Sequence, residues 1–390
     1  MKILFLAPQP FFVERGTPIA VRLAVESLCR AGHRVDLLTF HEGKDIAIPG
    51  MTLHRISPPP GAANVPIGFS PKKLICDLWL AAAACRLVRR GDYDVVHAVE
   101  EAVFIGLFLK LLGRFKLVYD MDSLLPDQIG EKWPAARPLL PALRWFEAQA
   151  VRRSDLVLGV CRHIVDRAAA LTDPARVHWT PDVAFTGSPA GTPDMLRSCF
   201  DEDRPLALYA GNLETYQGVG LLLEALERVP ADRRCNLAVL GGDPGRIRSF
   251  TELARDRGLA RHVAFIGPRP LDDLPAYLAQ ADILCSPRLK GVNTPMKIYS
   301  YLAAGKAILA TDIASHQQVL DSHCAVMVAP TVEAMAGGLD RLAGDPALRT
   351  RLGHAASERS GEHYSLPMFD RRMHDAYRVI GVAPLRESAA

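Results

Sequence analysis

The chain has 390 residues, of which 49% are hydrophobic and 23% charged, and its formal net charge is +3. This composition is typical of a globular protein and excludes disordered and fibrous chains. The length predicts two domains of ordinary size. So small a net charge gives no sign of a nucleic-acid-binding surface, and we expect no nucleic-acid partner.

The spacing of the cysteines and the length of the apolar runs argue against disulfide-stabilised, secreted and membrane-spanning proteins. The eight cysteines are scattered without a C-x-x-C pair, so we expect free thiols in a reducing cytosol rather than disulfides or a cysteine metal site. The apolar run at 2–7 is too short for a signal peptide and is followed by prolines and charges, which indicates a strand. Every longer apolar run contains a charged residue within about 18 positions, so we expect no membrane-spanning helix.

The first half alternates short apolar runs with amphipathic segments of helical length. The expected strands are 2–7, 34–40, 51–56, 94–98, 117–120 and 156–160, and the expected helices are 18–31, 71–90, 102–112, 138–153 and 162–170. These strands lack strict alternation of polar and apolar residues. That pattern is typical of a parallel sheet with helices on both faces.

A second alternating series follows a stretch rich in proline and glycine. Its expected strands are 206–210, 236–240, 263–266, 283–285, 307–311 and 325–328, and its expected helices are 218–229, 244–257, 272–280, 295–305 and those from 331 onward. We therefore predict an α/β protein with two Rossmann-like domains facing across a cleft, with ligands bound outside the carboxyl ends of the strands. The predicted divisions are a first domain at 1–183, a linker at 184–204, a second domain at 205–365 and a helix at about 366–390 that packs back on the first domain.

The stretch from Ser286 to Asp312 joins two expected strands through a loop and a helix. Thr294 is suited to cap this helix, and Pro295 to occupy its first position. Unpaired N–H groups at a helix start attract anions, and Lys297 lies in the first turn. We interpret the stretch as a phosphate site, although an ordinary strand–loop–helix connection would explain the stretch taken alone.

Three further glycine-rich loops follow expected strands, at 14–18, 209–218 and 240–245. The first loop lacks the G-x-G-x-x-G pattern, so the fingerprint of dinucleotide binding is absent. In the second loop, Asn212 and Gln217 offer uncharged hydrogen-bonding groups. The recurrence of such loops at neighbouring strand ends favours phosphate binding over unrelated tight turns.

These loops belong to a series of short motifs spread over most of the chain. The motifs are Gly16-Thr17, Gly32-His33-Arg34-Val35, Asp94-Val95-Val96-His97-Ala98, Tyr209-Ala210-Gly211, Leu240-Gly241-Gly242-Asp243-Pro244, Val263-Ala264-Phe265-Ile266-Gly267, Ala281-Asp282 and Tyr301-Leu302-Ala303-Ala304-Gly305-Lys306-Ala307. In their order and spacing the chain resembles the GT-B glycosyltransferases of family 4 (glycosyl transferases group 1), the retaining enzymes that use nucleotide sugars.

The resemblance implies a UDP- or GDP-linked donor bound by the second domain, with no other cofactor and no metal. The expected donor-binding residues are Gly16, Thr17, Gly211, Asn212, Gln217, Gly242, Arg269, Arg288, Asn293, Thr294, Pro295, Met296, Lys297 and Ser300. In the family an Arg and a Lys hold the diphosphate, and here those positions resemble Asn212 and Gln217. The family's two glutamates fall on Val292 and Ser300. We therefore expect Lys297 to be the main cation for the leaving diphosphate, with Arg288 as a second candidate.

The resemblance also implies a site for the acceptor in the first domain. His97 resembles the first His of the family's H-x-H segment, and we expect it at the end of its strand, with a purely structural role as the alternative. Asp120 and Asp122 form a D-x-D pair like the metal-binding motif of GT-A glycosyltransferases, but GT-B enzymes typically need no metal. We expect these two carboxylates, with Glu100 and Glu101, on the acceptor side or as loop caps. The expected catalytic residues are His97, Asp120, Asp122 and Lys297.

The expected function is retaining sugar transfer from a nucleotide sugar to an unidentified acceptor, a glycan or a lipid-linked molecule. Two alternatives stay open: an inactive GT-B-like partner subunit, because charged family residues are missing, and a sugar-nucleotide epimerase, which would need internal carboxylate and His pairs. Segments 71–90 and 103–116 mix basic and apolar residues. They favour a cytoplasmic enzyme in peripheral contact with the inner membrane surface, unless they are core-facing helices with solvated charges.

Overall fold

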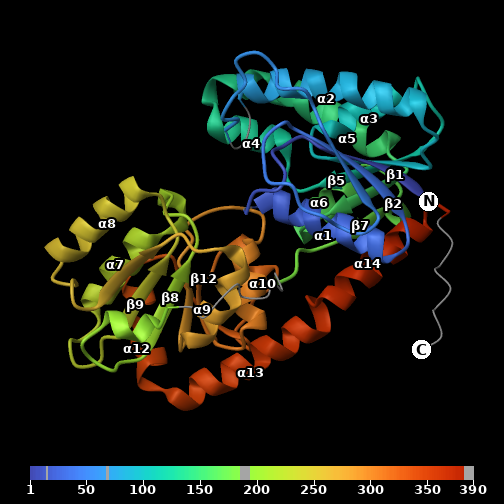
Figure 1. Cartoon of the computed structure of the whole chain (residues 1–390). Helices are drawn as coiled ribbons and strands as arrows, with labels where there is room; N and C mark the ends of the chain where they lie inside the picture. The colour runs from blue at the N-terminus through green and yellow to red at the C-terminus, as the bar shows by residue number, and fades with distance from the viewer. Residues whose placement is uncertain (15, 67–69, 185–193, 382–390) are drawn as a thin grey trace. The chain divides into compact units, whose positions relative to one another are not determined.

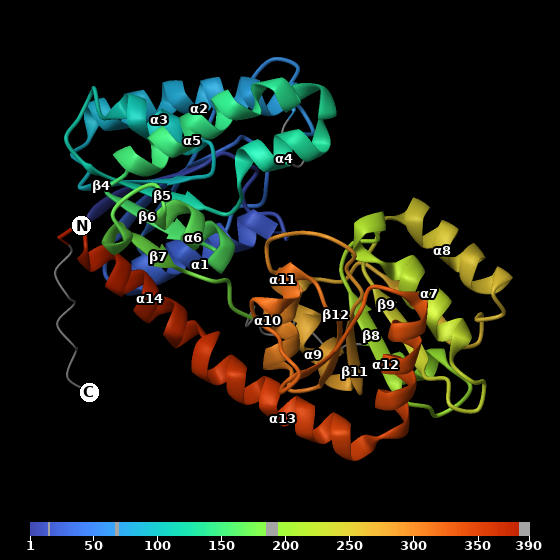
Figure 2. The same cartoon turned by 180° about the vertical axis from the view of Figure 1, so that it is seen from behind.

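A computed structural model describes residues 1–14, 16–66, 70–184 and 194–381. The chain divides into two compact units (Figures 1 and 2): Met1–Pro181 together with the segment from Pro367, and Asp182–Leu366. Part of the expected linker, 185–193, and the end of the expected C-terminal helix, 382–390, lie outside the described residues. No helix in the described residues is both long enough and apolar enough to cross a bilayer.

The first unit is built on a seven-stranded sheet of order β3-β2-β1-β4-β5-β6-β7, in which all neighbours pair in parallel. Its strands are β1 (Lys2–Ala7), β2 (Arg34–Thr39), β3 (Met51–Arg55), β4 (Val95–Val99), β5 (Lys116–Met121), β6 (Leu156–Gly159) and β7 (Val177–Trp179). Its helices are α1 (Gly16–Arg30), α2 (Pro71–Arg90), α3 (Ala102–Leu109), α4 (Leu125–Lys132), α5 (Leu140–Arg153), α6 (Arg162–Ala169) and α14 (Leu366–Arg378).

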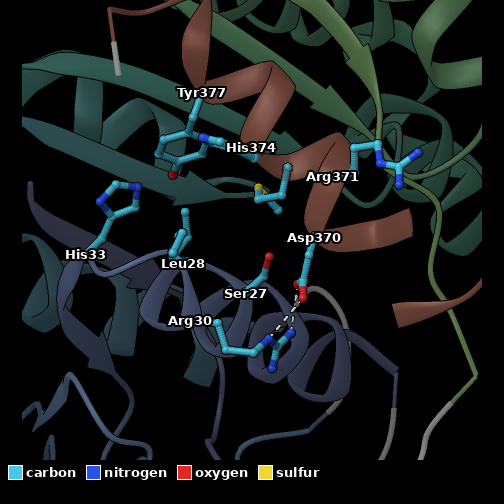
Figure 3. A pocket seen from close by; sticks show the side chains of 10 residues that line it. Ser27, Leu28, Arg30, His33, Asp370, Arg371, His374 and Tyr377 are labelled. Carbon is cyan, nitrogen blue, oxygen red and sulfur yellow. Dashed lines mark hydrogen bonds and ion pairs between the residues drawn. The ribbon is translucent and has the colours of Figure 1, made fainter. Parts of the chain in front are cut away.

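Helices cover both faces of this sheet, as the apolar strands predict. Figures 1 and 2 show α2, α3 and α5 on one face and α1 and α14 on the other. α14 is tied to α1 by a two-pronged ion pair in which the Arg30 guanidinium donates to both oxygens of Asp370, at 2.8 and 3.0 Å. The two helices border a pocket whose lining includes His33, His374 and Tyr377 (Figure 3).

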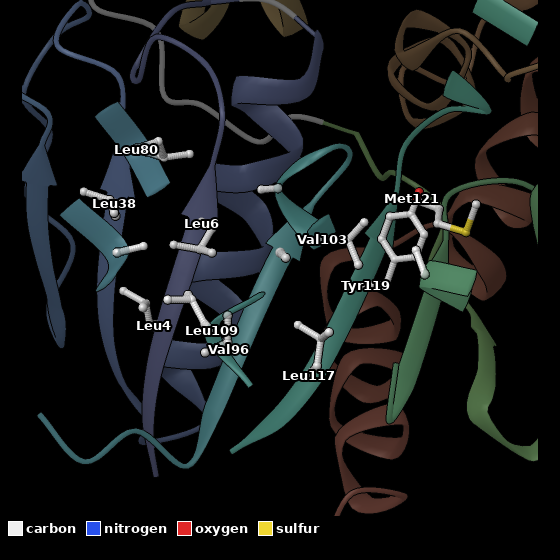
Figure 4. Close-up of a cluster of buried hydrophobic side chains, with 14 of the residues drawn as sticks. Leu4, Leu6, Leu38, Leu80, Val96, Val103, Leu109, Leu117, Tyr119 and Met121 are labelled. Atoms are coloured by element: carbon white, nitrogen blue, oxygen red, sulfur yellow. The ribbon is translucent and has the colours of Figure 1, made fainter. Parts of the chain in front are cut away.

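The core beneath α2, α3 and α5 is a cluster of buried hydrophobic side chains from the central strands and from these helices (Figure 4). Leu4 and Leu6 of β1 and Val96 of β4 are fully buried there, against Leu80 of α2 and Leu109 of α3. Burying each such side chain contributes about 1.5–3 kcal/mol. This core fixes the register of β1 and β4, and therefore where their carboxyl ends lie.

The second unit contains a six-stranded parallel sheet of order β10-β9-β8-β11-β12-β13. Its strands are β8 (Leu206–Ala210), β9 (Asn236–Leu240), β10 (Val263–Gly267), β11 (Ile283–Ser286), β12 (Ala307–Thr311) and β13 (Ala325–Val328). Its helices are α7 (Val219–Arg228), α8 (Pro244–Asp256), α9 (Leu274–Gln280), α10 (Met296–Ala303), α11 (Ala314–Gln317), α12 (Val332–Gly344) and α13 (Pro346–His363).

Strand order reverses between β1 and β4 in the first sheet and between β8 and β11 in the second. Loops on the two sides of such a reversal diverge and leave a crevice at the carboxyl edge, which is where open α/β sheets bind ligands. The relevant loops are those after β1 and β4 in the first unit, and those after β8 and β11 in the second. Among these loops, the sequence motifs mark those after β1, β8 and β11 as candidate ligand-binding loops.

Candidate functional site

Backbones pack directly against each other at the carboxyl ends of β8 and β9. The N–H of Gly211 donates to the Leu240 carbonyl at 2.9 Å, and a Cβ on Gly241 would lie 2.3 Å from the Gly211 oxygen. Gly241 also has φ +107, a region that side chains rarely enter. Gly241 is therefore required by the close approach of the two backbones.

Lys297 extends from the first turn of α10 toward the loop after β8. Its Nζ lies 3.9 Å from the centroid of the Tyr209 ring and donates to Oε1 of the buried Gln217 at 3.3 Å. A Cβ on Gly211 would lie 2.7 Å from this Nζ. The glycine at 211 thus makes room for the ammonium group, which occupies the reversal point between β8 and β11.

A second cation, Arg288, lies on the loop after β11. Its guanidinium carbon lies 5.4 Å from the centroid of the Tyr216 ring, and its Nε donates to the Lys290 carbonyl at 2.8 Å. Burial, and then the charge of Arg288, lower the pKa of Lys297 from 10.5 to about 7. Burial also lowers the pKa of Arg288. Within the described part of the chain neither cation forms an ion pair, so the two create an uncompensated positive charge.

The start of α10 differs from the prediction. The helix begins at Met296, Pro295 is its N-cap residue, and no side chain caps it. Thr294 was predicted to be the cap, but it is buried and its hydroxyl donates to the Ser315 carbonyl at 3.1 Å. The predicted cap is therefore wrong, because α11 supplies a better acceptor for that hydroxyl. The positive end of α10 still lies beside Lys297 and is not neutralised by a capping carboxylate.

The other predicted donor residues fall into different surroundings. Asn212 is exposed, and its Oδ1 accepts from the N–H of Glu214 at 3.2 Å. Arg269 is already engaged by four acceptors: the Tyr277 hydroxyl, the Ile266 and Pro268 carbonyls and the Asp194 carboxylate. It braces the end of β10. Ser300 lies one turn into α10 and is partly buried.

Gly242 also follows the close backbone packing. It has φ +90, and a Cβ there would lie 2.5 Å from the Leu213 side chain. Asn293 and Met296 lie beside Lys297 in sequence and are partly buried. The structure therefore brings together Gly211, Gln217, Lys297 and α10, while Arg269 is taken up by its own strand end.

Sequence reasoning missed a buried histidine in this unit. Nδ1 of His316 donates to the Thr311 carbonyl at 2.7 Å, so its Nε2 accepts from the Ser286 hydroxyl at 2.9 Å. Burial lowers the pKa of His316 to about 4, and the imidazole is neutral. The His316 side chain therefore joins the ends of β11 and β12 through hydrogen bonds to both. The available signal was a hydroxyl residue at the end of each of these strands, Ser286 and Thr311.

In the first unit, His97 is not at the strand end as predicted. It lies in the middle of β4 and is fully buried, because its ring packs against Phe5 of β1 with 4.1 Å between ring centroids. Its Nε2 lies 3.1 Å from Oδ2 of Asp120, and its Nδ1 lies 2.7 Å from the hydroxyl of Tyr377. His97 is therefore a core residue that reaches the carboxyl edge only through Asp120.

Acidic side chains gather at the carboxyl ends of β4 and β5. Glu100 has φ +49, which is unusual for a residue with a side chain. Its N–H donates to the Asp120 carbonyl at 2.9 Å and its Oε1 accepts from the Ser123 hydroxyl at 2.9 Å. Glu101 forms an ion pair with Lys73 of α2. Asp122 follows β5 and is partly buried. Glu100, Asp120 and Asp122 thus lie near one another, whereas Glu101 is neutralised.

The remaining predicted residues, Gly16 and Thr17, open α1; Arg15 of the same loop lies outside the described residues. Gly16 has φ +31 and open space where a Cβ would be. Among the residues that the structure describes, no group of three or more His, Cys, Asp or Glu side chains is arranged to hold a metal ion.

Two family models match the chain in succession. Residues 15–182 match the model described as a glycosyl transferase 4-like domain, and residues 196–359 match the model described as glycosyl transferases group 1. The chain belongs to the group 1 glycosyltransferases. The predicted family is therefore confirmed, and with it the prediction of a sugar-transferring enzyme.

Two curated relatives of this glycosyltransferase carry names that describe sugar transfer. The GDP-mannose-dependent alpha-(1-6)-phosphatidylinositol monomannoside mannosyltransferase of Mycolicibacterium smegmatis is 28% identical over 316 residues, which span 76% of this chain and 78% of the relative. The alpha-D-kanosaminyltransferase of Streptomyces kanamyceticus is 25% identical over 252 residues, and the match spans 62% of this chain and 65% of the relative, just under two thirds.

Solved structures confirm the predicted GT-B fold of the glycosyltransferase. Sucrose-phosphate synthase from Thermosynechococcus elongatus superimposes with a TM-score of 0.78 at 19% identity, covering 97% of this chain and 98% of that one. The Anabaena protein HepE, solved in complex with UDP-glucose, gives a TM-score of 0.73 at 15% identity, covering 97% and 99%. At these identities the likeness concerns the fold, and the roles of individual side chains stay predictions.

Proposed function

We propose that this glycosyltransferase moves a sugar from a UDP- or GDP-linked donor to the hydroxyl of a glycan or lipid-linked acceptor, with retention at the anomeric carbon. The observation that carries the proposal is the cation pair Lys297 and Arg288 at the reversal point between β8 and β11, which forms no ion pair with any residue that the structure describes. A nucleoside diphosphate is the ligand that would compensate this charge.

The chemistry follows from where charge develops. As the bond between sugar and diphosphate breaks, negative charge grows on the phosphate oxygen, and fixed positive groups stabilise it without reorganising. Lys297 and the positive end of α10 supply such groups. The departing phosphate oxygen takes up the proton of the acceptor hydroxyl, so no separate base is needed. In the first unit, Asp120, Asp122 and Glu100 would orient the acceptor by accepting hydrogen bonds from its other hydroxyls.

The proposal assigns no metal ion or other cofactor to the transfer. Lys297 and Arg288 provide two positive charges, which is the charge that a divalent cation would bring to the diphosphate. We expect transfer at full rate after dialysis against EDTA, measured against the same enzyme supplied with magnesium or manganese. A rate restored only by added metal would contradict this part of the proposal.

The donor is tested with nucleotides alone. HepE was solved with UDP-glucose, and the Mycolicibacterium relative is named as GDP-mannose-dependent, so both bases belong in the panel. We expect UDP or GDP to raise the melting temperature of the protein at millimolar concentration, and the matching nucleoside monophosphate to do so less, because it offers one phosphate to Lys297. A folded protein that responds to no nucleotide would favour the inactive-subunit alternative.

Donor binding should weaken as the pH rises above 7. In the free protein the pKa of Lys297 is about 7, and the bound diphosphate favours the charged ammonium. Above pH 7 binding therefore requires proton uptake, and the affinity falls by up to about tenfold per pH unit. Calorimetry between pH 7 and 9 with UDP-glucose or GDP-mannose measures this, because the phosphates of both stay ionised throughout. Lys297→Arg should flatten the profile; an equally steep profile in that variant would assign the proton to another group.

The proposed location is the cytoplasmic face of a membrane, with α2 and α3 in peripheral contact. Both helices expose large apolar side chains, led by Leu78 and Trp79 on α2 and by Phe108 and Leu111 on and after α3. Neighbouring α5 adds exposed Trp145 and Phe146. The exposed side of α2 continues into basic residues: Arg86, Arg89 and Arg90. Apolar side chains that insert beside basic ones fit an acidic lipid surface.

Flotation with vesicles tests this contact. We expect the protein to float with vesicles that contain acidic phospholipid at low salt, and to float less at high salt or with neutral vesicles. Leu78→Ser combined with Phe108→Ser should abolish flotation at an unchanged melting temperature, because both side chains are exposed. Absence of binding at low salt would remove the membrane from the proposal without affecting the donor site.

A further inference from the structure

A hydrogen-bonded series of three side chains, Tyr377–His97–Asp120, links α14 to the carboxyl edge of the first sheet. The hydroxyl of Tyr377 lies 2.7 Å from Nδ1 of His97, and Nε2 of His97 lies 3.1 Å from Oδ2 of Asp120. A carboxylate only accepts, so Nε2 carries the proton and Nδ1 accepts from the tyrosine. The three groups come from β4, β5 and α14, and the outer two are separated by more than half of the chain.

The middle residue of this series, His97, is tightly enclosed. His97 and Tyr377 are fully buried or nearly so, and the Phe5 ring lies nearly parallel to the imidazole, with 14° between the planes. Both ring nitrogens have their partner, so the imidazole has one orientation and one tautomer. Burial also raises the pKa of the Tyr377 hydroxyl far above its ordinary value; it stays a proton donor throughout the working range.

Asp120, at the other end of this series, is in a different environment. Asp120 is at the carboxyl end of β5, and its side chain keeps 16% of its surface exposed. Oδ2 is held by His97, and within the described residues no partner is found for Oδ1. The backbone carbonyl of Asp120 is also engaged, by the N–H of Glu100. The Oδ2 oxygen is thus held by the buried His97, while Oδ1 remains available at the edge of the sheet where the acceptor is proposed to bind.

We propose that Tyr377 and His97 are positioning residues, which together hold the Asp120 carboxylate so that its second oxygen accepts a hydrogen bond from an acceptor hydroxyl next to the one that attacks. The inference rests on the proposed function, because it presumes transfer to a hydroxyl near β5. It gives α14 a part in the acceptor half of the reaction. Any buried histidine needs partners for its nitrogens, so the functional reading depends on where the hydrogen bonds lead: one of them ends on a carboxylate at the carboxyl edge of the sheet.

Two substitutions of His97 separate positioning from packing. In His97→Gln the amide nitrogen replaces Nε2 and can still donate to Asp120, whereas in His97→Asn the shorter amide replaces Nδ1 and reaches only toward Tyr377. We expect His97→Asn to lower kcat for transfer by about 100-fold, and His97→Gln and Tyr377→Phe by about tenfold or less. Donor KM should be unchanged in all three. Packing alone would make the two His97 variants equally poor.

The assay uses UDP-glucose and GDP-mannose as donors and octyl α-D-glucopyranoside as a simple hydroxyl acceptor, with nucleotide release to water measured in parallel. We expect the His97→Asn defect in transfer but not in release to water. Equal defects in both His97 variants, or full transfer by Asp120→Asn, would overturn the inference. Neither result touches the donor site, whose test is nucleotide binding by Lys297 variants.

A readout without substrate keeps the inference testable if octyl glucoside is a poor acceptor. In the wild-type protein, proton NMR should show a slowly exchanging Nε2–H signal from His97, because that proton is buried in its bond to Asp120. Asp120→Ala should remove the signal, and Tyr377→Phe should shift it. A signal from Nδ1–H instead would reverse the direction of the hydrogen bonds and overturn the inference.

Discussion

Lys297→Ala is expected to lower kcat for sugar transfer by about 10²–10³-fold, the usual effect of removing one fixed group that stabilises developing negative charge. The ammonium is the group that extends into the space opened by Gly211, 3.3 Å from Gln217. Arg288 remains in the variant, and so does the start of α10, so activity falls without vanishing. Steady-state kinetics with saturating donor measure the change.

Lys306→Ala is the matched control for that experiment. Lys306 follows the same helix, after Gly305, and immediately precedes β12, at the opposite edge of the sheet from the proposed diphosphate site. We expect Lys306→Ala to retain at least about half of the activity, because Lys306 is a partly buried charge remote from the proposed reaction. Lys297→Ala should also melt at an unchanged or slightly higher temperature, because the native protein holds a partly buried cation next to Arg288. Comparable losses in both variants would mean that Lys297 is not the main cation.

Gly218→Ala is expected to destabilise the second unit by about 3 kcal/mol. Gly218 has φ +77, and a Cβ there would lie 1.9 Å from the Pro287 carbonyl oxygen. Both the left-handed backbone and the overlap must be relieved by moving the loop after β8 away from the loop after β11. The melting temperature of this unit should fall by roughly 6–12 °C, and donor affinity should fall with it, since Gln217 moves as well.

Gly258→Ala separates the two causes. Gly258 is also left-handed, at φ +68, but a Cβ there meets open space. This variant therefore carries only the backbone cost of about 1 kcal/mol, a shift of roughly 2–4 °C, and should bind the donor normally. Equal melting temperatures for the two alanine variants would show that the contact between the loops after β8 and β11 yields easily.

The elements with strong local patterns could be predicted from the sequence, and the short ones could not. The strand at 206–210 has the predicted bounds of β8, because five apolar residues lie between a proline and a glycine. β7 was missed: it has three residues, one of them His178, and only its pairing with β6 makes it a strand. α4 was missed because Pro126 and Gly130 hide its periodicity. Tertiary contacts override weak local preference in both cases.

The same limit applies to the site. The place of Lys297 in the first turn of α10 could be predicted, because a helix start after a glycine-rich loop is a local signal; its role toward the donor stays a prediction. The partner of His97 could not, since Tyr377 lies 280 residues away and no spacing rule connects the two. Arg269 was predicted to bind the donor from its position alone. The structure shows its guanidinium donating to acceptors at the end of its own strand, an arrangement that only three-dimensional packing decides; its role toward the donor stays a prediction.

The first unit is discontinuous, and this has a consequence for how the protein is made. A ribosome releases residues 1–181 long before α14, and the intervening second unit, Asp182–Leu366, is contiguous and can complete its sheet as it emerges. Until α14 appears, the imidazole of His97 lacks its tyrosine, and the face of the first sheet that α1 and α14 share lacks part of its cover. The unit that is synthesised first is therefore completed only after the second, and part of its sheet stays exposed on the nascent chain until α14 emerges.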